Sequence, residues 1–389
     1  MNTKYISSVV IGILLLIVVS ACGGEKEDTS ANKDWINQAN LDSDESIDEL
    51  YEKAKEEDEL VVYAQSSATE NVVDSFIEEY PDINLSISKV SSMDMLEKVR
   101  LEDEGNVEGA DVVFGKDTNG FWKNELVDSG IIHSYQPDSI TDNLMDPYSD
   151  YPGLPIITET ITVLYNNEAY DKAPIDNWWE LTKPEWKGKI TMKNPLEAAD
   201  IQDLFLTMIQ HSDEMEEAYR EEFGEDIELN ETKNAGYEFI KRLLENDVVL
   251  RSSMGDSVDA VADSPKNNPP VVIASTVKLR DTESEEIPLT MVENLEPKVS
   301  VPGTTKAFIV DGSPNVNSSK LFIRWLAGSD DGQGEGFSPF NNPGTFSTRE
   351  DIEQDFDVPK LNDIDLWEED VDYYYENANE LRDFLIDIL

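Results

Sequence analysis

The chain has 389 residues, of which 83 are Asp or Glu and only 30 are Lys or Arg, so its formal net charge is −53. A surface of this sign repels the phosphate backbone of nucleic acids, and we expect no nucleic-acid partner. Hydrophobic residues make up 39%, with 7 Trp, 14 Tyr and 13 Phe, which excludes a mainly disordered chain and favours two domains. The acidic residues are spread along the chain, which is typical of a halophilic, solvated surface in a salty exterior.

Residues 1–21 have the pattern of a secretory signal peptide. Lys4 precedes an apolar run from Val9 to Val19, and small residues lead to the single cysteine, Cys22. A helix of this length rises about 16 Å, roughly half the hydrocarbon core of a bilayer, so it is too short for a permanent span. The sequence VSAC at 19–22 resembles the lipobox of bacterial lipoproteins, which implies cleavage before Cys22 and attachment of lipid (palmitate) to its thiol. The alternative is an ordinary signal peptide with an incidental cysteine.

The first folded unit is predicted to follow a flexible tether. Residues 22–34 have almost no apolar side chains, and folding is expected to start near Trp35. Apolar residues at helical spacing predict a helix within 42–59. Strands are then predicted at 60–64, 85–90 and 112–114, with helices at about 69–80 and from about 92. This alternation predicts a parallel sheet covered on both faces.

A second unit of the same kind follows an extended, β-branched stretch at 157–167. Strands are predicted at 189–192, 248–250 and 271–274, with helices between them. Another extended stretch at 298–312 precedes residues 313–389, which have no sheet of their own and are expected to return to the first unit. The predicted fold is therefore α/β, with two doubly wound lobes joined by two crossover strands. Lobe I comprises 35–160 with 305–389, and lobe II comprises 161–304.

Several motifs resemble a known family. The most specific is APIDNWWELTKPEWKGKITMKNP at 173–195, supported in order by VVYAQSS, ADVVFG, ITVLYNNEAY, SVPGTTKAFIVDGSPN and SKLFIRWLAG. Over about residues 58–328 the chain resembles the extracellular solute-binding proteins of ABC importers, in the type II periplasmic-binding-protein-like cluster that also holds ferric- and thiamine-binding proteins. The resemblance implies two lobes that close on a small solute and deliver it to a membrane permease.

The resemblance also implies a location and a set of partners. We expect a monomeric binding protein, held at the extracytoplasmic face of the cell membrane by its acylated N-terminus, with no cofactor and no catalytic residues. A tether of this kind raises the concentration of the protein near its transporter.

Candidate ligand contacts lie at the carboxyl ends of the predicted strands, where ligands bind in such sheets. They are Ser66, Ser67, Ser92, Lys116, Thr158, Asn194, Arg251, Ser252, Ser275, Thr276 and Lys278. Cations are scarce in this chain, and hydroxyl groups and helix N-termini suit an anionic head group. We therefore expect a phosphorylated sugar, a phosphonate or a carboxylate. The alternative is that these residues are ordinary surface lysines and helix-capping serines.

Ferric iron is the alternative ligand. Ferric-binding relatives hold iron with neighbouring tyrosines near the segment that here reads VVIASTVKLRD, where this chain has Ser275, Thr276 and Lys278 instead. These are poor ligands for a hard cation, although a carboxylate or tyrosine from elsewhere could complete a site. We expect no metal site.

Two other classes of function remain open. A secreted hydrolase would need carboxylates alone, since the two histidines, His133 and His211, lack H-E-x-x-H spacing and no G-x-S-x-G, P-loop or G-x-G-x-x-G is present. With so many acidic residues, carboxylate pairs arise by chance and carry no weight. A surface adhesin would share the anchor and the acidity but would not need a hinge.

Overall fold

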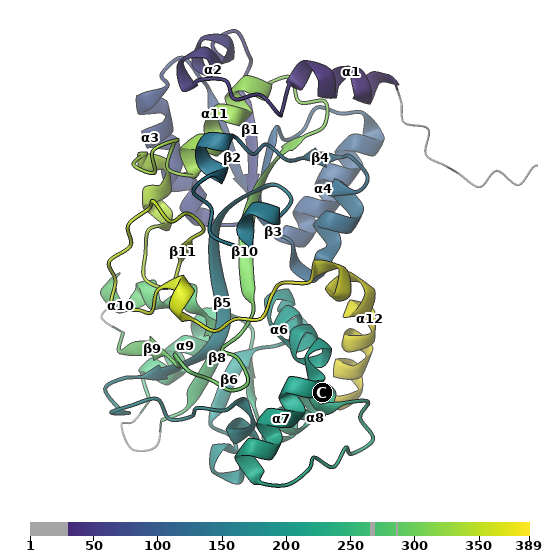
Figure 1. Ribbon diagram of the computed structural model, residues 1–389, viewed down its shortest axis with the longest axis vertical. Coiled ribbons are helices and arrows are strands. Elements are labelled where there is room, and N and C mark those ends of the chain that lie inside the picture. The colour runs from purple at the N-terminus through teal and green to yellow at the C-terminus, as the bar shows by residue number, and fades with distance from the viewer. Residues whose placement is uncertain (1–29, 265–268, 285–286) are drawn as a thin grey trace, which may run out of the picture.

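The computed structural model describes residues 30–264, 269–284 and 287–389, so the proposed signal peptide and Cys22 lie outside the described residues. Figure 1 shows an elongated molecule with two α/β lobes, one above the other, and two strands that run between them. The predicted fold class is confirmed. Among the described residues no helix combines the length and apolar character that a membrane crossing requires.

The first lobe has a five-stranded sheet in the order β2-β1-β3-β10-β5, in which β1 to β3 are parallel and β10 is antiparallel to β3. Short strands β4 and β11 pair with β10 and β5. Its strands are β1 (Leu60–Ala64), β2 (Leu85–Lys89), β3 (Val112–Lys116), β4 (Ile132–His133), β5 (Leu154–Asn166), β10 (Pro302–Val310) and β11 (Phe346–Ser347). Its helices are α1 (Ser30–Ala39), α2 (Ile47–Ala54), α3 (Val72–Glu79), α4 (Ser92–Gly105), α5 (Asp138–Thr141) and α11 (Val316–Leu326).

The second lobe continues the sheet as β5-β8-β6-β7, with β6 parallel to both of its neighbours and β9 paired to β5. Its strands are β6 (Ile190–Lys193), β7 (Val249–Arg251), β8 (Val271–Ser275) and β9 (Leu289–Met291). Its helices are α6 (Ala199–Gln210), α7 (Ser212–Phe223), α8 (Ala235–Glu245), α9 (Met254–Ala262) and α10 (Asp281–Ser284), and α12 (Val371–Ile388) packs on it.

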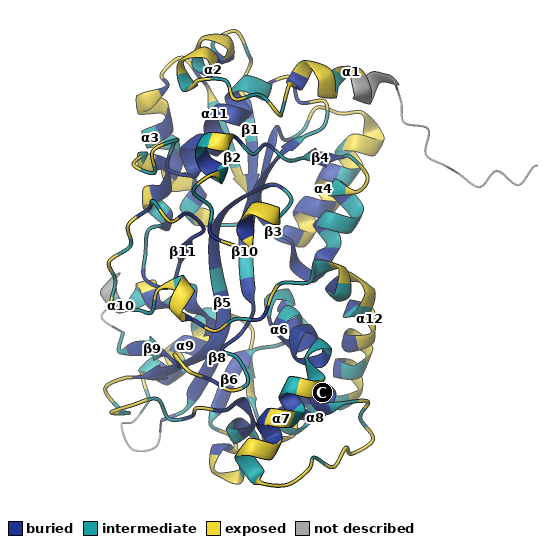
Figure 2. Ribbon diagram, viewed as in Figure 1, coloured by how far each residue is buried: buried dark blue, intermediate teal, exposed yellow. Residues whose placement is uncertain are grey.

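Strand β5 belongs to both lobes. Residues up to Thr160 pair with β10 or β11, and residues from Ile161 onward pair with β8 and β9. A second segment, 299–301, runs beside this switch point: the Thr160 hydroxyl donates to the Val301 carbonyl at 2.8 Å, and the Ser300 hydroxyl donates to the Ile161 carbonyl. Figure 2 shows both crossing strands as largely buried.

The tryptophans of the most specific motif belong to the core of the second lobe. Trp178 and Trp179 are fully buried, and the Trp179 ring packs edge-on against Tyr219 and Phe239. Buried aromatic pairs of this geometry stabilise a core beyond their area. The motif therefore stabilises the fold.

The two ends of the folded part differ from expectation. Helix α1 begins at Ser30, so it includes residues 30–34, which we assigned to the tether. Helix α12, expected on the first lobe, packs against α6 and places Tyr374, Leu381 and Leu385 in the core of the second lobe. The Tyr374 hydroxyl lies 2.7 Å from that of Thr207 on α6. The physical reason is the apolar face of α6, which needs a cover that the second sheet does not provide.

The start of α12 also contacts the first lobe. Gly120 has φ +69°, and a Cβ there would lie 1.9 Å from the Val371 carbonyl oxygen, so the close approach requires glycine. Lys123 donates to Asp372 at 2.8 Å, and the Phe121 and Tyr375 rings meet edge-on. The C-terminal helix therefore bridges the two lobes.

If α12 is part of the second core, then Leu381→Ala should lower the free energy of unfolding by about 2–5 kcal/mol, because it leaves a cavity at a fully buried site. The matched control is Ile386→Ala on the same helix, at a side chain that is 55% exposed, which should change stability by no more than about 0.5 kcal/mol. Urea denaturation measures both. Equal effects of the two substitutions would contradict this packing.

Candidate binding site between the lobes

A small cavity lies where β5 crosses between the lobes. Both lobes contribute to its wall, and its charged lining residues are Lys116, Asp117, Glu159, Asp200, Asp203 and Glu369. Its volume is about 20 Å³, which is room for roughly one water molecule. The lobes are thus closed on each other at this point.

Glu159 on β5 is the centre of a bridge between the lobes. Lys116, at the end of β3, forms an ion pair with Glu159, and the Ser275 hydroxyl at the end of β8 donates to the same carboxylate at 2.7 Å. Burial lowers the pKa of Lys116, but Glu159 and Asp200 raise it by more, so the net shift is upward. Lys116 is therefore a firmly charged group whose charge Glu159 already balances.

The first turns of α6 face the first lobe. Asn119, in the loop after β3, donates its backbone N–H to Asp203 Oδ1 at 2.9 Å and its side-chain amide to Gln202 Oε1 at 3.1 Å. Asn119 holds a left-handed backbone (φ 56°), which asparagine tolerates better than most residues. These two hydrogen bonds join the lobes directly.

Two further carboxylates line the cavity, Asp117 from the first lobe and Glu369 from the C-terminal segment. Asp117 accepts the backbone N–H groups of Trp122 and Lys123 at 2.7 and 2.8 Å, and burial raises its pKa to about 6. Glu369 precedes α12 and pairs with Lys306 on β10 at 3.2 Å. Burial raises the pKa of Glu369 as well, although Lys306 opposes the shift.

Of the residues predicted from sequence, four lie at or beside this cavity. Lys116 lines it, and Ser275 contacts it through Glu159. Thr276 accepts the Thr160 N–H and donates to the Gly344 carbonyl, so it supports the crossing strand. The Ser92 hydroxyl donates to the Lys116 carbonyl at 2.7 Å and positions that loop.

The remaining predicted residues do not line the cavity. Thr158 is buried beside Thr304 on the face of β5 opposite Glu159, because side chains alternate along a strand. Arg251 and Ser252 line a separate, open hollow at the edge of the second lobe. Lys278 is paired with Asp281 at 3.2 Å.

Three predicted residues serve local turns instead. The Ser66 hydroxyl accepts the Ala68 N–H, Ser67 is exposed at the start of that turn, and Asn194 Oδ1 accepts the Leu196 N–H. The interpretation as a helix-capping serine fits Ser66.

Sequence reasoning missed the carboxylates that dominate the cavity. Asp200, Asp203 and Glu369 could not be told from the other acidic residues of the chain. Glu159 carried a usable signal, since a charged residue within a β-branched, buried strand needs a partner.

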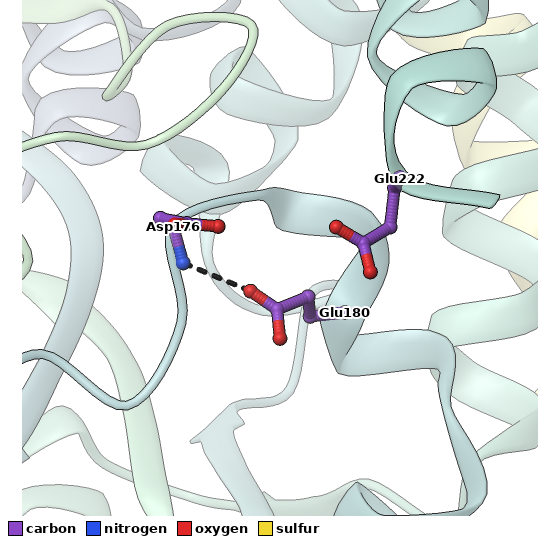
Figure 3. Close-up of side chains that lie close together, drawn as sticks. All are labelled: Asp176, Glu180 and Glu222. Atoms are coloured by element: carbon purple, nitrogen blue, oxygen red, sulfur yellow. Dashed lines mark hydrogen bonds between the residues drawn. The ribbon is translucent and has the colours of Figure 1, made fainter. Parts of the chain in front are cut away.

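A second group of acidic residues lies in the second lobe, outside this cavity. Figure 3 shows Asp176, Glu180 and Glu222 with their carboxylates turned toward one another; one oxygen of each lies within 4.8 Å of the others. Lys183 forms an ion pair with Glu222 and lies 3.7 Å from Glu180, so its ammonium group already partly neutralises these three carboxylates. It is the one group of three or more potential metal ligands among the described residues.

The chain belongs to the bacterial extracellular solute-binding proteins, because the model of that family matches residues 71–361. Members are solute-binding components of ABC importers, so a small solute and a membrane permease are the partners that membership implies, and the location is extracytoplasmic. No curated protein matches the sequence.

Solved structures share the fold at low sequence identity. Iron-bound HitA from Pseudomonas aeruginosa is 13% identical with a TM-score of 0.65, covering 85% of this chain and 99% of its own. The periplasmic binding protein AfuA from Actinobacillus pleuropneumoniae, with fructose-6-phosphate bound, is 19% identical with a TM-score of 0.63, covering 85% and 98%. Ferric iron-binding protein A from Mannheimia haemolytica, in an open conformation, is 16% identical with a TM-score of 0.60, covering 85% and 98%.

The raised pKa of Asp117 predicts a pH dependence of stability. Because the folded state holds this proton up to about pH 6 and the unfolded state releases it near 3.8, stability should fall as pH rises through that window. The difference corresponds to about 3 kcal/mol.

Asp117→Asn should remove this loss, so wild type should lose stability relative to the variant between pH 4 and about 6.5. Denaturation at several pH values measures it, with the exposed Asp138→Asn as the control for removing one charge. A parallel dependence in wild type and Asp117→Asn would contradict the assignment.

Proposed function

We propose that this protein captures its solute between the two lobes at the crossing strands, where both lobes line this cavity. The cavity has room for about one water molecule, so the lobes close less far on a bound solute than they do here. The observation that carries the proposal is the shared wall: Lys116 and Asp117 come from one lobe, Asp200 and Asp203 from the other, and Glu159 from the strand between them. A solute can reach such a site only when the lobes separate. Hinge bending of β5 and of residues 299–301 is the motion that this connection allows.

The polar contacts between the lobes are weak enough to break on opening, and the Phe121–Tyr375 ring contact at α12 would separate with them. Asn119 supplies two hydrogen bonds, and each is worth about 0.5–1.5 kcal/mol. The Lys123–Asp372 pair at the start of α12 is largely solvent-facing and contributes at most about 1 kcal/mol. Solute binding can therefore shift the balance between open and closed forms.

The anchor and the assembly state belong to this proposal too. Residues 1–21 act as a lipoprotein signal peptide, Cys22 carries the lipid, and the residues between Cys22 and the start of α1 at Ser30 tether the folded part to the cell membrane. The protein acts as a monomer with lobes divided near residues 160 and 304, and it binds without catalysing a reaction. The VSAC sequence and the family membership support these points.

The similar solved structures differ in the kind of solute that they hold, a metal ion or a sugar phosphate. AfuA is described with fructose-6-phosphate bound and HitA with iron bound. In this chain the residues that line the cavity include no tyrosine, and within the described part no three of its carboxylates gather as a preformed metal site. The geometry therefore favours an organic solute over ferric iron.

Closure should be measurable in solution. When purified protein is screened with ferric salts, sugar phosphates and organic amines, the solute that raises the melting temperature should also reduce the radius of gyration in X-ray scattering. Binding without compaction would favour a surface adhesin, and would contradict the proposed closure.

A variant at the contact between the lobes sharpens this test. Asn119→Gly keeps the left-handed backbone but removes the bond to Gln202, so affinity for the same solute should fall about 2- to 10-fold. Asn106→Gly is the matched control, since Asn106 has φ 47° at the exposed end of α4 and lies outside the cavity wall. An unchanged affinity in Asn119→Gly would show that this contact plays no part in closure.

A further inference from the structure

The charges around the cavity are strongly unequal. Five of its lining residues are carboxylates and one is a lysine. Two of the carboxylates have a cationic partner within the protein: Glu159 pairs with Lys116, and Glu369 pairs with Lys306. Asp117 accepts two backbone N–H groups of its own loop. Among the described residues, the lining carboxylates without an ion pair are therefore Asp117 in the first lobe and two carboxylates of α6 in the second.

Asp200 and Asp203 have no cationic partner in the described part of the chain. Asp200 accepts only its neighbouring Ile201 N–H, and Asp203 accepts the Asn119 N–H. Lys116 and Lys193 act on Asp200 electrostatically, but neither forms an ion pair with it. Burial raises the pKa of Asp200 and raises that of Asp203 well above its ordinary value, which Glu369 and Asp200 reinforce.

An acceptor without a donor lies at the same junction. The side-chain oxygen of Asn119 is buried and has no hydrogen-bond partner among the residues that the structure describes, and Asn119 is 7% exposed. Its amide and its backbone N–H hold it against Gln202 and Asp203 of α6. A buried carbonyl oxygen in this position needs a donor, which the described residues do not supply.

The spacing of the carboxylates around the cavity indicates whether they suit a metal ion or an organic cation. One metal ion needs several oxygens gathered within a few ångströms. The carboxylates of the cavity do not form such a group among the described residues, whereas the group in Figure 3 does. An organic cation with several N–H donors spans more widely spaced acceptors and matches this arrangement better.

One wall of the cavity comes from outside the family match. The family match ends at residue 361, and Glu369 lies beyond it. The segment that carries Glu369 is held against residues 299–301, because the Trp367 backbone N–H donates to the Ser300 carbonyl at 2.8 Å. Lys306 fixes the Glu369 carboxylate there. The C-terminal segment thus adds a negative charge to this cavity.

We propose that the solute carries a primary ammonium or guanidinium group, which Asp200 and Asp203 bind when the lobes close, with Glu369 adding to the negative field. This inference rests on the proposed capture between the lobes and narrows its substrate class. It replaces the anionic solute expected from Lys116 and Lys278, because both lysines are already paired with acids of the chain.

The test is a binding screen on the purified protein in about 0.5 M NaCl, where a Debye length near 4 Å suppresses adsorption of cations to the acidic surface. The probes are primary monoamines, diamines such as 1,4-diaminobutane, and guanidines; inorganic phosphate, fructose 6-phosphate and ferric citrate form the opposing arms. At least one amine or guanidine should bind, with compaction in scattering.

The variants are chosen to fold. Asp200→Asn and Asp203→Asn keep an acceptor oxygen and remove a half-buried charge, and each should weaken amine binding about tenfold or more, as expected for loss of a charged hydrogen bond. Asp213→Asn is the matched control: like Asp200, it lies in the first turn of its helix, but it is exposed, and affinity should not change. Thermal unfolding of the free proteins checks that all variants fold.

The outcomes separate this inference from the proposed function. Binding and compaction with phosphate, the sugar phosphate or iron, but with no amine or guanidine, would overturn the cationic solute and leave capture intact. Amine binding that is equally strong in Asp200→Asn and Asp203→Asn would overturn the assignment to α6. Absence of binding and compaction with every probe would count against both.

Discussion

The continuous pairing of β5 with both sheets is the constraint on which the rest of the structure depends. A strand that changes partners between Thr160 and Ile161 must keep its hydrogen bonds on both sides, so the lobes can rotate about it but cannot slide past it. Residues 299–301 reinforce the same point through the side chains of Thr160 and Ser300. The site therefore forms at this switch point, and Glu159 is held at its centre.

The acidic residues at the crossing strands differ in their surroundings from those on the surface. A chain with a net charge of −53 exposes most of its acids, where water and salt screen them. At the crossing strands Asp117 is buried and Asp200 and Asp203 are half-buried, and removing a carboxylate from water without a counter-ion is unfavourable. Such an arrangement destabilises the closed form without solute, and in our account this strain is relieved when the solute supplies the missing charge. Functional sites often retain unfavourable groups of this kind.

The sequence allowed the architecture to be predicted because its signals are regular. Alternating strands and helices gave two α/β units, and the two β-branched stretches at 157–167 and 298–312 gave the crossing strands, which lie at Leu154–Asn166 and Pro302–Val310. These features depend on local periodicity and on apolar side chains, which the sequence displays directly.

The site could be predicted only in part, because it depends on orientation and on long-range partners. A one-residue step along β5 separates Thr158, which faces the core, from Glu159, which faces the cavity. Lys116 was recognised as a strand-end cation, but its pairing with Glu159 joins residues that are 43 positions apart. The place of α12 depended on the uncovered face of α6, which no pattern within α12 reveals.

The central claim is that one solute touches both lobes at once across β5. Hydrogen exchange measured by mass spectrometry, with and without the bound solute, tests it most directly. The account predicts simultaneous protection of the loop after β3 and of the first turns of α6, two segments more than 80 residues apart that meet through Asn119 and Asp203. Protection confined to one lobe, with the other unchanged, would contradict it.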